Sequence, residues 1–158
     1  DNNFIFISPE TLSNEPMEKD FWEDLCNRLR AEGYKIYCNA MFFHNLIPGC
    51  EAMFLTYEES IELAKYAKAI IGMRSGFIEC LSQNNVPMFV LYTDFPKRQG
   101  FKKLESNKVL SGYTITLLPN INKNLIHEYD VNSYKSEKYL LLDILNNIIC
   151  ENRKEINK

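Results

Sequence analysis

A short turn between two apolar segments concentrates the side chains of this sequence that could bind an anion. Arg74, Ser75 and Gly76 follow the buried-strand pattern of residues 69–72 and precede a helical pattern at residues 77–82. Arginine offers a permanent cation, serine a hydroxyl and glycine an unhindered backbone, while the amides at the start of a helix add positive potential. The turn therefore predicts a site for a phosphate or a diphosphate.

Glu79 lies one helical turn beyond Ser75, so its carboxylate can reach the same crevice. A carboxylate there could accept hydrogen bonds from ribose or sugar hydroxyls, as an acidic side chain does in dinucleotide folds. A structural role is the alternative, because Arg74 could form an ion pair with Glu79 or Glu10. Ser75 and Gly76 could equally act only as a helix cap and a turn residue.

The elements that must position this turn alternate regularly along the chain. Apolar runs predict strands at residues 3–7, 34–38, 52–55, 69–72, 87–92 and 113–118. Helical patterns cover about sixteen residues before Gly33, residues 56–68, residues 77–82 and a last segment that begins near residue 133. We interpret residues 40–51 as a packed loop, and residues 101–112 give no clear pattern. This alternation predicts an α/β fold with a doubly wound, mainly parallel, six-stranded Rossmann-like sheet.

The carboxyl ends of the predicted strands supply the remaining candidate site residues. In a doubly wound sheet the first and fourth strands are commonly neighbours, and ligands bind beyond the carboxyl ends of the strands. We therefore expect Ser8 to join the phosphate site and Glu10 to lie near the ribose or sugar. The other strand ends supply candidate residues for the base and the rim of the site, namely Asn39, Phe54, Leu55, Thr56, Tyr92 and Asp94.

Composition excludes several other classes of protein. The chain has 158 residues, which fits one domain, and its net charge of −3 without a basic stripe argues against a nucleic-acid partner. No apolar run approaches the roughly 20 residues of a transmembrane helix. The five cysteines form no CxxC pair, which favours reduced, buried thiols in a cytoplasmic protein. His44 and His127 are interpreted as loop residues without a second ligand at metal-binding spacing, so no metal is expected.

Three consecutive segments carry a family resemblance. Thr56 to Ala64 (TYEESIELA), Ile70 to Glu79 (IIGMRSGFIE) and Pro87 to Tyr92 (PMFVLY) resemble the nucleotide-sugar-binding half of GT-B glycosyltransferases, in particular the heptosyltransferase-like members. The resemblance covers residues 50–95 well and the rest as architecture. It implies that Arg74, Ser75 and Gly76 hold the donor diphosphate, that Glu79 approaches the ribose or sugar, and that the turn at residues 54–56 lies near the base. Two positions differ from the family, which usually has Asp or Asn at Arg74 and tends to have His at Glu79.

The resemblance also implies a function. The chain would be the C-terminal donor domain of a longer glycosyltransferase of surface polysaccharide or glycan synthesis, in the cytoplasm or at the inner face of the membrane. A missing N-terminal domain would bind the acceptor and supply the catalytic base, so no catalytic residue is assigned here. We expect single displacement without a cofactor or metal, with Arg74 and Lys97 or Arg98 stabilising the leaving diphosphate. The alternatives are a polysaccharide pyruvyl transferase-like domain and a non-catalytic α/β module that binds a phosphorylated metabolite.

Overall fold

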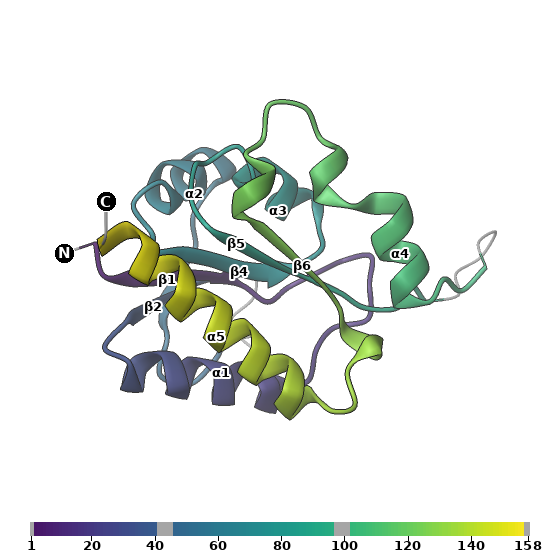
Figure 1. Cartoon of the computed structure of the whole chain (residues 1–158), viewed down its shortest axis with the longest axis horizontal. Helices are drawn as coiled ribbons and strands as arrows, with labels where there is room; N and C mark the ends of the chain where they lie inside the picture. Colours follow the sequence, from purple (N-terminus) through teal and green to yellow (C-terminus); the bar gives the residue numbers. More distant parts are fainter. Residues whose placement is uncertain (1, 41–45, 97–101, 157–158) are drawn as a thin grey trace.

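The computed structural model describes residues 2–40, 46–96 and 102–156 and has one six-stranded sheet (Figure 1). The strands are β1 (Phe4–Ser8), β2 (Lys35–Asn39), β3 (Glu51–Met53), β4 (Ala69–Met73), β5 (Met88–Tyr92) and β6 (Ile126–Asp130). All neighbouring strands are parallel, in the order β3-β2-β1-β4-β5-β6. The chain order reverses where β1 pairs with β4, which confirms the doubly wound α/β sheet predicted from the sequence.

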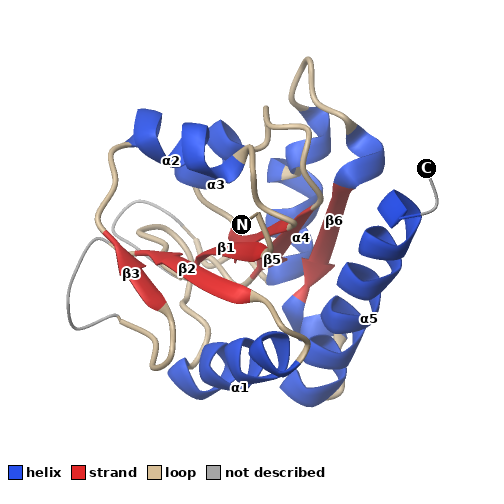
Figure 2. Cartoon of the chain, turned by 90° about the vertical axis from the view of Figure 1, so that its left-hand side faces the viewer, coloured by secondary structure: helices blue, strands red, loops and turns tan. Residues whose placement is uncertain are grey.

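Helices cover both faces of the sheet. They are α1 (Lys19–Ala31), α2 (Tyr57–Ala64), α3 (Gly76–Leu81), α4 (Ser106–Tyr113) and α5 (Glu137–Ile156). Helices α1 and α5 lie together on one face, and α2 and α3 lie on the other, with α4 beside β6 (Figure 2). The connections after β1 and after β4 therefore leave the sheet toward opposite faces, which opens a crevice at its carboxyl edge.

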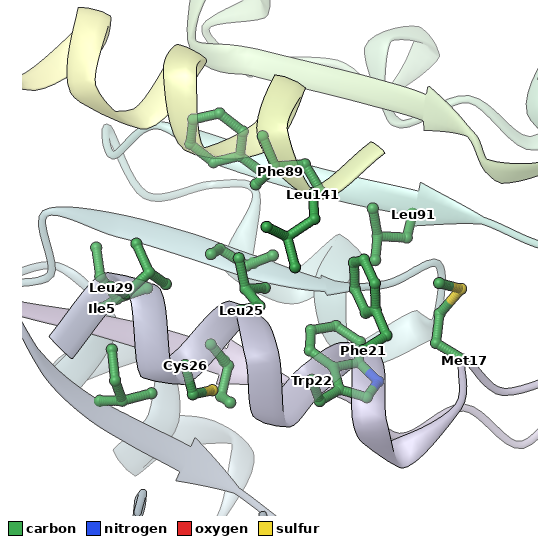
Figure 3. Close-up of a cluster of buried hydrophobic side chains, with 14 of the residues drawn as sticks. Ile5, Met17, Phe21, Trp22, Leu25, Cys26, Leu29, Phe89, Leu91 and Leu141 are labelled. Carbon is green, nitrogen blue, oxygen red and sulfur yellow. The ribbon is translucent and has the colours of Figure 1, made fainter. Parts of the chain in front are cut away.

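The central strands are buried on both faces because their side chains supply both apolar layers. In β1, Ile5 and Ile7 join the cluster under α1 and α5, while Phe4 and Phe6 join the cluster under α2, α3 and α4. Every residue of β1, β4 and β5 is buried, as the continuous apolar runs predict. The apolar stripe of α1 packs against the first cluster, with Trp22 in the core (Figure 3).

The sixth strand is not where the sequence pattern placed it. Residues 113–118 end α4 and form a short 3₁₀ turn, and the sixth strand is β6, at residues 126–130. The hydroxyl of Thr114 accepts a hydrogen bond from the Thr116 N–H, and the carboxylate of Glu128 accepts one from the Ile115 N–H at 2.8 Å. Side-chain oxygens therefore accept the hydrogen bonds of these backbone N–H groups, which in a strand would pair with a neighbouring strand. His127 accordingly lies in β6 and not in a loop, with its ring stacked on Phe89.

Other boundaries differ by a few residues. Strand β3 ends at Met53, so Phe54 and Leu55 belong to the connection before α2 and not to the strand. Helix α4 lies in the region without a clear sequence pattern. Part of the predicted loop at residues 40–51, namely residues 41–45 with His44, lies outside the described residues, as do Lys97 and Arg98.

Gly72 sets the spacing between β4, β1 and α3, and its replacement tests this packing. A Cβ atom at Gly72 would lie 2.9 Å from the Ser8 carbonyl oxygen and 2.4 Å from Cδ1 of Ile78. We expect Gly72→Ala to lower the free energy of unfolding by about 1–3 kcal/mol, because overpacking displaces backbone and side chains. In the control Gly112→Ala, a Cβ atom meets no atom within 4 Å, so stability should stay equal or rise by less than about 1 kcal/mol. Urea denaturation of both variants measures the difference, and equal stabilities would contradict this role of Gly72.

Candidate functional site

A cavity of about 480 Å³ lies at the carboxyl edge of the sheet, where β1 and β4 meet. Strand ends β1, β2 and β4 and the first residues of α2 and α3 form its walls. Its lining residues are Ser8, Glu10, Thr11, Leu12, Ser13, Asn39, Ala40, Phe54, Leu55, Tyr57, Ser75, Gly76 and Phe77. This set includes seven of the candidates predicted from the sequence, namely Ser8, Glu10, Asn39, Phe54, Leu55, Ser75 and Gly76.

The polar wall of the cavity is held in place by backbone hydrogen bonds. Asn39 Oδ1 accepts a hydrogen bond from the Leu55 N–H at 3.1 Å, which ties the end of β2 to the connection before α2. Ser75 Oγ accepts from the Ile78 N–H at 3.3 Å and so caps α3. Ser75 therefore fulfils the structural role and also lines the cavity. A ligand would meet side chains whose positions are already fixed.

Aromatic rings form a further part of the wall. Phe54 is 49% exposed and Tyr57 is 55% exposed, although both are large apolar side chains. The ring of Tyr57 lies 5.2 Å from that of Phe77, centroid to centroid, at an interplanar angle of 46°. Exposed aromatic side chains that line a concave site suit a flat aromatic ligand.

Thr56 has a structural part in this wall. Its hydroxyl accepts a hydrogen bond from the Glu59 N–H at 3.2 Å, and the Glu59 carboxylate accepts one from the Thr56 N–H at 2.8 Å. This capping box, predicted from the sequence, fixes the first residue of α2. Thr56 does not line the cavity itself, but it positions Tyr57, which does line it.

Arg74 and Glu79 form an ion pair outside the main cavity. The guanidinium of Arg74 donates to the Glu79 carboxylate, and its Nε donates to the Tyr113 carbonyl oxygen at 2.8 Å. The Arg74 side chain is only 12% exposed and lines a separate cavity of about 200 Å³. Ser13, Ser75 and Gly76 line both cavities. The structure thus shows the ion pair between Arg74 and Glu79 that the sequence analysis gave as the structural alternative.

Tyr92, a candidate from the end of β5, is fully buried. Its hydroxyl donates to Glu128 at 2.5 Å and accepts from the Ile115 N–H at 3.1 Å. Burial and the Glu128 carboxylate raise the pKa of Tyr92 above its ordinary value. Tyr92 therefore connects β5 to β6 and to the turn after α4, and it does not reach the main cavity.

Asp94 lines a third cavity, of about 670 Å³, near the carboxyl ends of β5 and β6. Its carboxylate accepts hydrogen bonds from the Ser106 N–H at 2.9 Å and the Asn132 amide at 2.7 Å, and Lys103 pairs with it at 2.8 Å. Burial opposes ionisation of Asp94, but these three donors together lower its pKa below the ordinary value. Asp94 holds the start of α4 and lies apart from the main cavity.

Six lining residues were not singled out in the sequence, namely Thr11, Leu12, Ser13, Ala40, Tyr57 and Phe77. The sequence pattern identifies Tyr57 and Phe77 only as parts of helices. Both lie in the first turn of a helix that begins beside the cavity. An aromatic residue in the first turn after a strand end is the signal that could have identified them. Leu12, which is largely exposed, lies in a stretch interpreted only as a polar connection.

Two further features bear on the chemistry available. Within residues 2–40, 46–96 and 102–156, no group of three or more His, Cys, Asp or Glu side chains could hold a metal ion. In the same residues, none of the helices combines the length and the apolar character needed to cross a membrane.

Comparisons with known proteins place the fold. No protein-family model matches the sequence, and no curated protein matches it. Among solved structures, the alignment with E. coli ADP-heptose LPS heptosyltransferase II covers 94% of this chain and 47% of that protein, with 14% identity and a TM-score of 0.60. E. coli heptosyltransferase WaaC with ADP matches 61% of this chain and 35% of its own, with 14% identity and a TM-score of 0.52. WaaC with ADP-2-deoxy-2-fluoro heptose matches 73% and 42%, with 13% identity and a TM-score of 0.52.

These matches confirm the fold implied by the resemblance. The chain has a GT-B glycosyltransferase-like fold, with six parallel strands between two layers of helices. At these identities the similarity shows the fold alone. The chain spans less than half the length of each of these solved structures.

Proposed function

We propose that this domain binds the nucleoside diphosphate part of a nucleotide sugar and serves as the donor domain of a glycosyltransferase in surface polysaccharide or glycan synthesis. The position and lining of the 480 Å³ cavity carry this proposal. The cavity lies where the strand order reverses, which is where open α/β sheets bind their ligands. It combines an aromatic wall with a few fixed polar groups, as small-molecule sites do.

The cavity offers a partner for each part of a nucleotide. The base would pack against Phe54 and Tyr57, and the carboxylate of Glu10 would accept hydrogen bonds from ribose hydroxyls. The diphosphate would lie against the hydroxyls of Ser8 and Ser75. Phosphates can approach the backbone of Gly76. Glycine has no side chain, and no protein atom lies within 4 Å of the place that a Cβ atom would occupy.

Arg74 would contribute to binding only by changing partners. It lines the neighbouring cavity of about 200 Å³, where Glu79 and the Tyr113 carbonyl oxygen hold its guanidinium. A diphosphate would have to replace both partners, and their loss offsets part of the roughly 1.5–3 kcal/mol that a charged hydrogen bond contributes. Glu79 therefore competes with the diphosphate for the same cation.

Solved structures suggest which nucleotide to test first. Two solved WaaC structures are complexes with ADP and with ADP-2-deoxy-2-fluoro heptose. ADP is therefore the first candidate for the cavity of this chain. The other bases must be tested as well, because an aromatic wall accepts the face of any base.

The remaining parts of the reaction belong to the proposal as well. Since the chain spans 47% of the length of heptosyltransferase II, an N-terminal domain would supply the acceptor site and the catalytic base. The transfer would be a single displacement in which Ser75, the amides at the start of α3 and a released Arg74 stabilise the leaving diphosphate. All five cysteines are free thiols, which fits a cytoplasmic location.

A tyrosine pair on and beside α2 tests whether the cavity binds a nucleotide. We expect calorimetry of the domain with ADP, UDP, GDP, CDP and CMP to show one selective ligand. Tyr57→Ala should weaken its binding by about 1–3 kcal/mol, because a base loses its aromatic contact. Tyr66→Ala is the matched control, since Tyr66 is also exposed (53%) but does not line the cavity. Absence of binding by every nucleotide, or equal losses in the two variants, would contradict the proposal.

The Arg74–Glu79 ion pair gives a test of the diphosphate contact. We expect Arg74→Ala to weaken binding of the nucleoside diphosphate by about 1 kcal/mol, less than a full charged hydrogen bond because Glu79 already neutralises the cation. Glu79→Gln should strengthen binding by about 0.5–1 kcal/mol, because it releases the guanidinium. The nucleoside without phosphates serves as the control ligand and should bind both variants equally. If both variants bind the diphosphate as the unmodified domain does, Arg74 has no part in the site.

A further inference from the structure

A second, smaller cavity adjoins the nucleotide cavity at the proposed place of the diphosphate. Its volume is about 200 Å³, and it shares Ser13, Ser75 and Gly76 with the 480 Å³ cavity. A group that is linked to a diphosphate at Ser75 and Gly76 can therefore enter it. One water molecule occupies about 30 Å³ in the liquid, so this cavity has the volume of roughly seven waters, which is room for a single sugar ring.

Asn14 brings an unused hydrogen-bond acceptor to the 200 Å³ cavity. The residue lines this cavity and is only 8% exposed, and its amide nitrogen donates to the Thr93 carbonyl oxygen at 3.2 Å. That bond fixes which end of the amide is the oxygen. Within the part of the chain that the structure describes, Asn14 Oδ1 accepts no hydrogen bond, yet it is not sealed from water. A ligand with a hydroxyl group can satisfy this oxygen from the cavity.

Arg74 brings unused donors to the same cavity. Its Nε and Nη2 are held by the Tyr113 carbonyl oxygen and the Glu79 carboxylate, whereas Nη1 has no hydrogen-bond partner among the described residues. A hydroxyl that accepts from Nη1 leaves the ion pair with Glu79 intact. Because Glu79 already balances the guanidinium, a second carboxylate would gain little from Arg74 and would be repelled by Glu79.

Apolar side chains complete the lining of the 200 Å³ cavity. They belong to Phe95, Val109 and Tyr113. A sugar ring presents C–H groups on its faces and hydroxyl groups at its edge. Apolar walls with one acceptor and one donor group match such a ring, as in other small-molecule sites.

We propose that the 200 Å³ cavity holds the transferred sugar of the donor, that this sugar carries no charged group, and that Asn14 selects it. The inference rests on the proposed function, since it requires a nucleotide in the larger cavity. Asn14 Oδ1 accepts a hydrogen bond from one sugar hydroxyl, and Arg74 Nη1 donates to another. The carboxylate of a uronic acid meets the Asn14 oxygen, which cannot donate to it, and the negative charge of Glu79. A protonated amino sugar is repelled by Arg74.

Calorimetry with nucleotide sugars tests the class of sugar. The 158-residue chain is titrated with ADP, UDP and GDP, with ADP-glucose, UDP-glucose, UDP-galactose and GDP-mannose, and with UDP-glucuronic acid. We expect at least one neutral nucleotide sugar to bind about 3- to 10-fold more tightly than its own nucleoside diphosphate, which is the gain from one or two hydrogen bonds. The affinity for UDP-glucuronic acid should not exceed that for UDP.

The outcomes separate this inference from the proposed function. If a nucleoside diphosphate binds but no neutral sugar adds affinity, or if glucuronic acid adds more than glucose does, the inference is wrong and the nucleotide site stands. If no nucleotide binds at all, both are wrong.

Variants locate the gain in the 200 Å³ cavity. Asn14→Ala should make the nucleotide sugar and its diphosphate bind equally, with unchanged affinity for the diphosphate, since Asn14 does not line the larger cavity. This variant also loses the bond to Thr93, so Tyr113→Ala is a second test. Tyr113 is exposed and holds Arg74 only through its backbone, and its loss should reduce the gain. Tyr139→Ala, at an exposed tyrosine of α5, is the matched control and should keep the gain.

Circular dichroism confirms that each variant is folded, and Tyr113→Ala decides if Asn14→Ala is not. Retention of the full gain in folded Asn14→Ala would overturn the role of Asn14. Equal gains in Tyr113→Ala and Tyr139→Ala would overturn the placement of the sugar in this cavity.

Discussion

The parallel pairing of β1 with β4 is the constraint on which the rest of this structure depends. Ser8 and Gly72 are register partners there, and the strands can carry α3 at this distance because Gly72 has no side chain. From this pair the chain leaves toward α1 on one face and toward α3 on the other (Figure 2), and the cavity lies at the edge between them. The cavity is a direct consequence of that divergence, and the residues that follow β1 and β4 must line it.

Charge at the site is balanced within the protein before any ligand binds. Arg74 pairs with Glu79 and donates to a backbone carbonyl, and these contacts offset part of the desolvation penalty of a nearly buried guanidinium. The proposed diphosphate site consequently rests first on hydroxyls and backbone amides and only then on a cation. An arginine that must exchange one anionic partner for another offers less net affinity than a free one, but it responds only to a ligand that brings negative charge to the same place.

The sequence predicts the frame better than the site. Some features depend only on residues that are close together in the sequence. These are the continuous apolar runs of β1, β4 and β5 and the capping box at Thr56. β6 escaped prediction because Glu128 interrupts its apolar pattern and because its carboxylate holds the turn after α4, a contact between distant segments. The orientation of Arg74 escaped prediction because Glu79 and a diphosphate offer a guanidinium similar chemistry, and only the packed structure selects between them.

The central claim is that a nucleotide binds where β1 and β4 meet, and NMR mapping of backbone amides tests it most directly. The ¹⁵N-labelled domain is titrated with the nucleoside diphosphate that binds most tightly. We expect the largest shifts at Ser8, Asn39, Ser75 and Gly76, which line the cavity from three strand ends. Shifts concentrated instead around Asp94, Ser106 and Asp130, at the cavity beyond β5 and β6, would contradict this account. Absence of any shift at saturating nucleotide would contradict it equally.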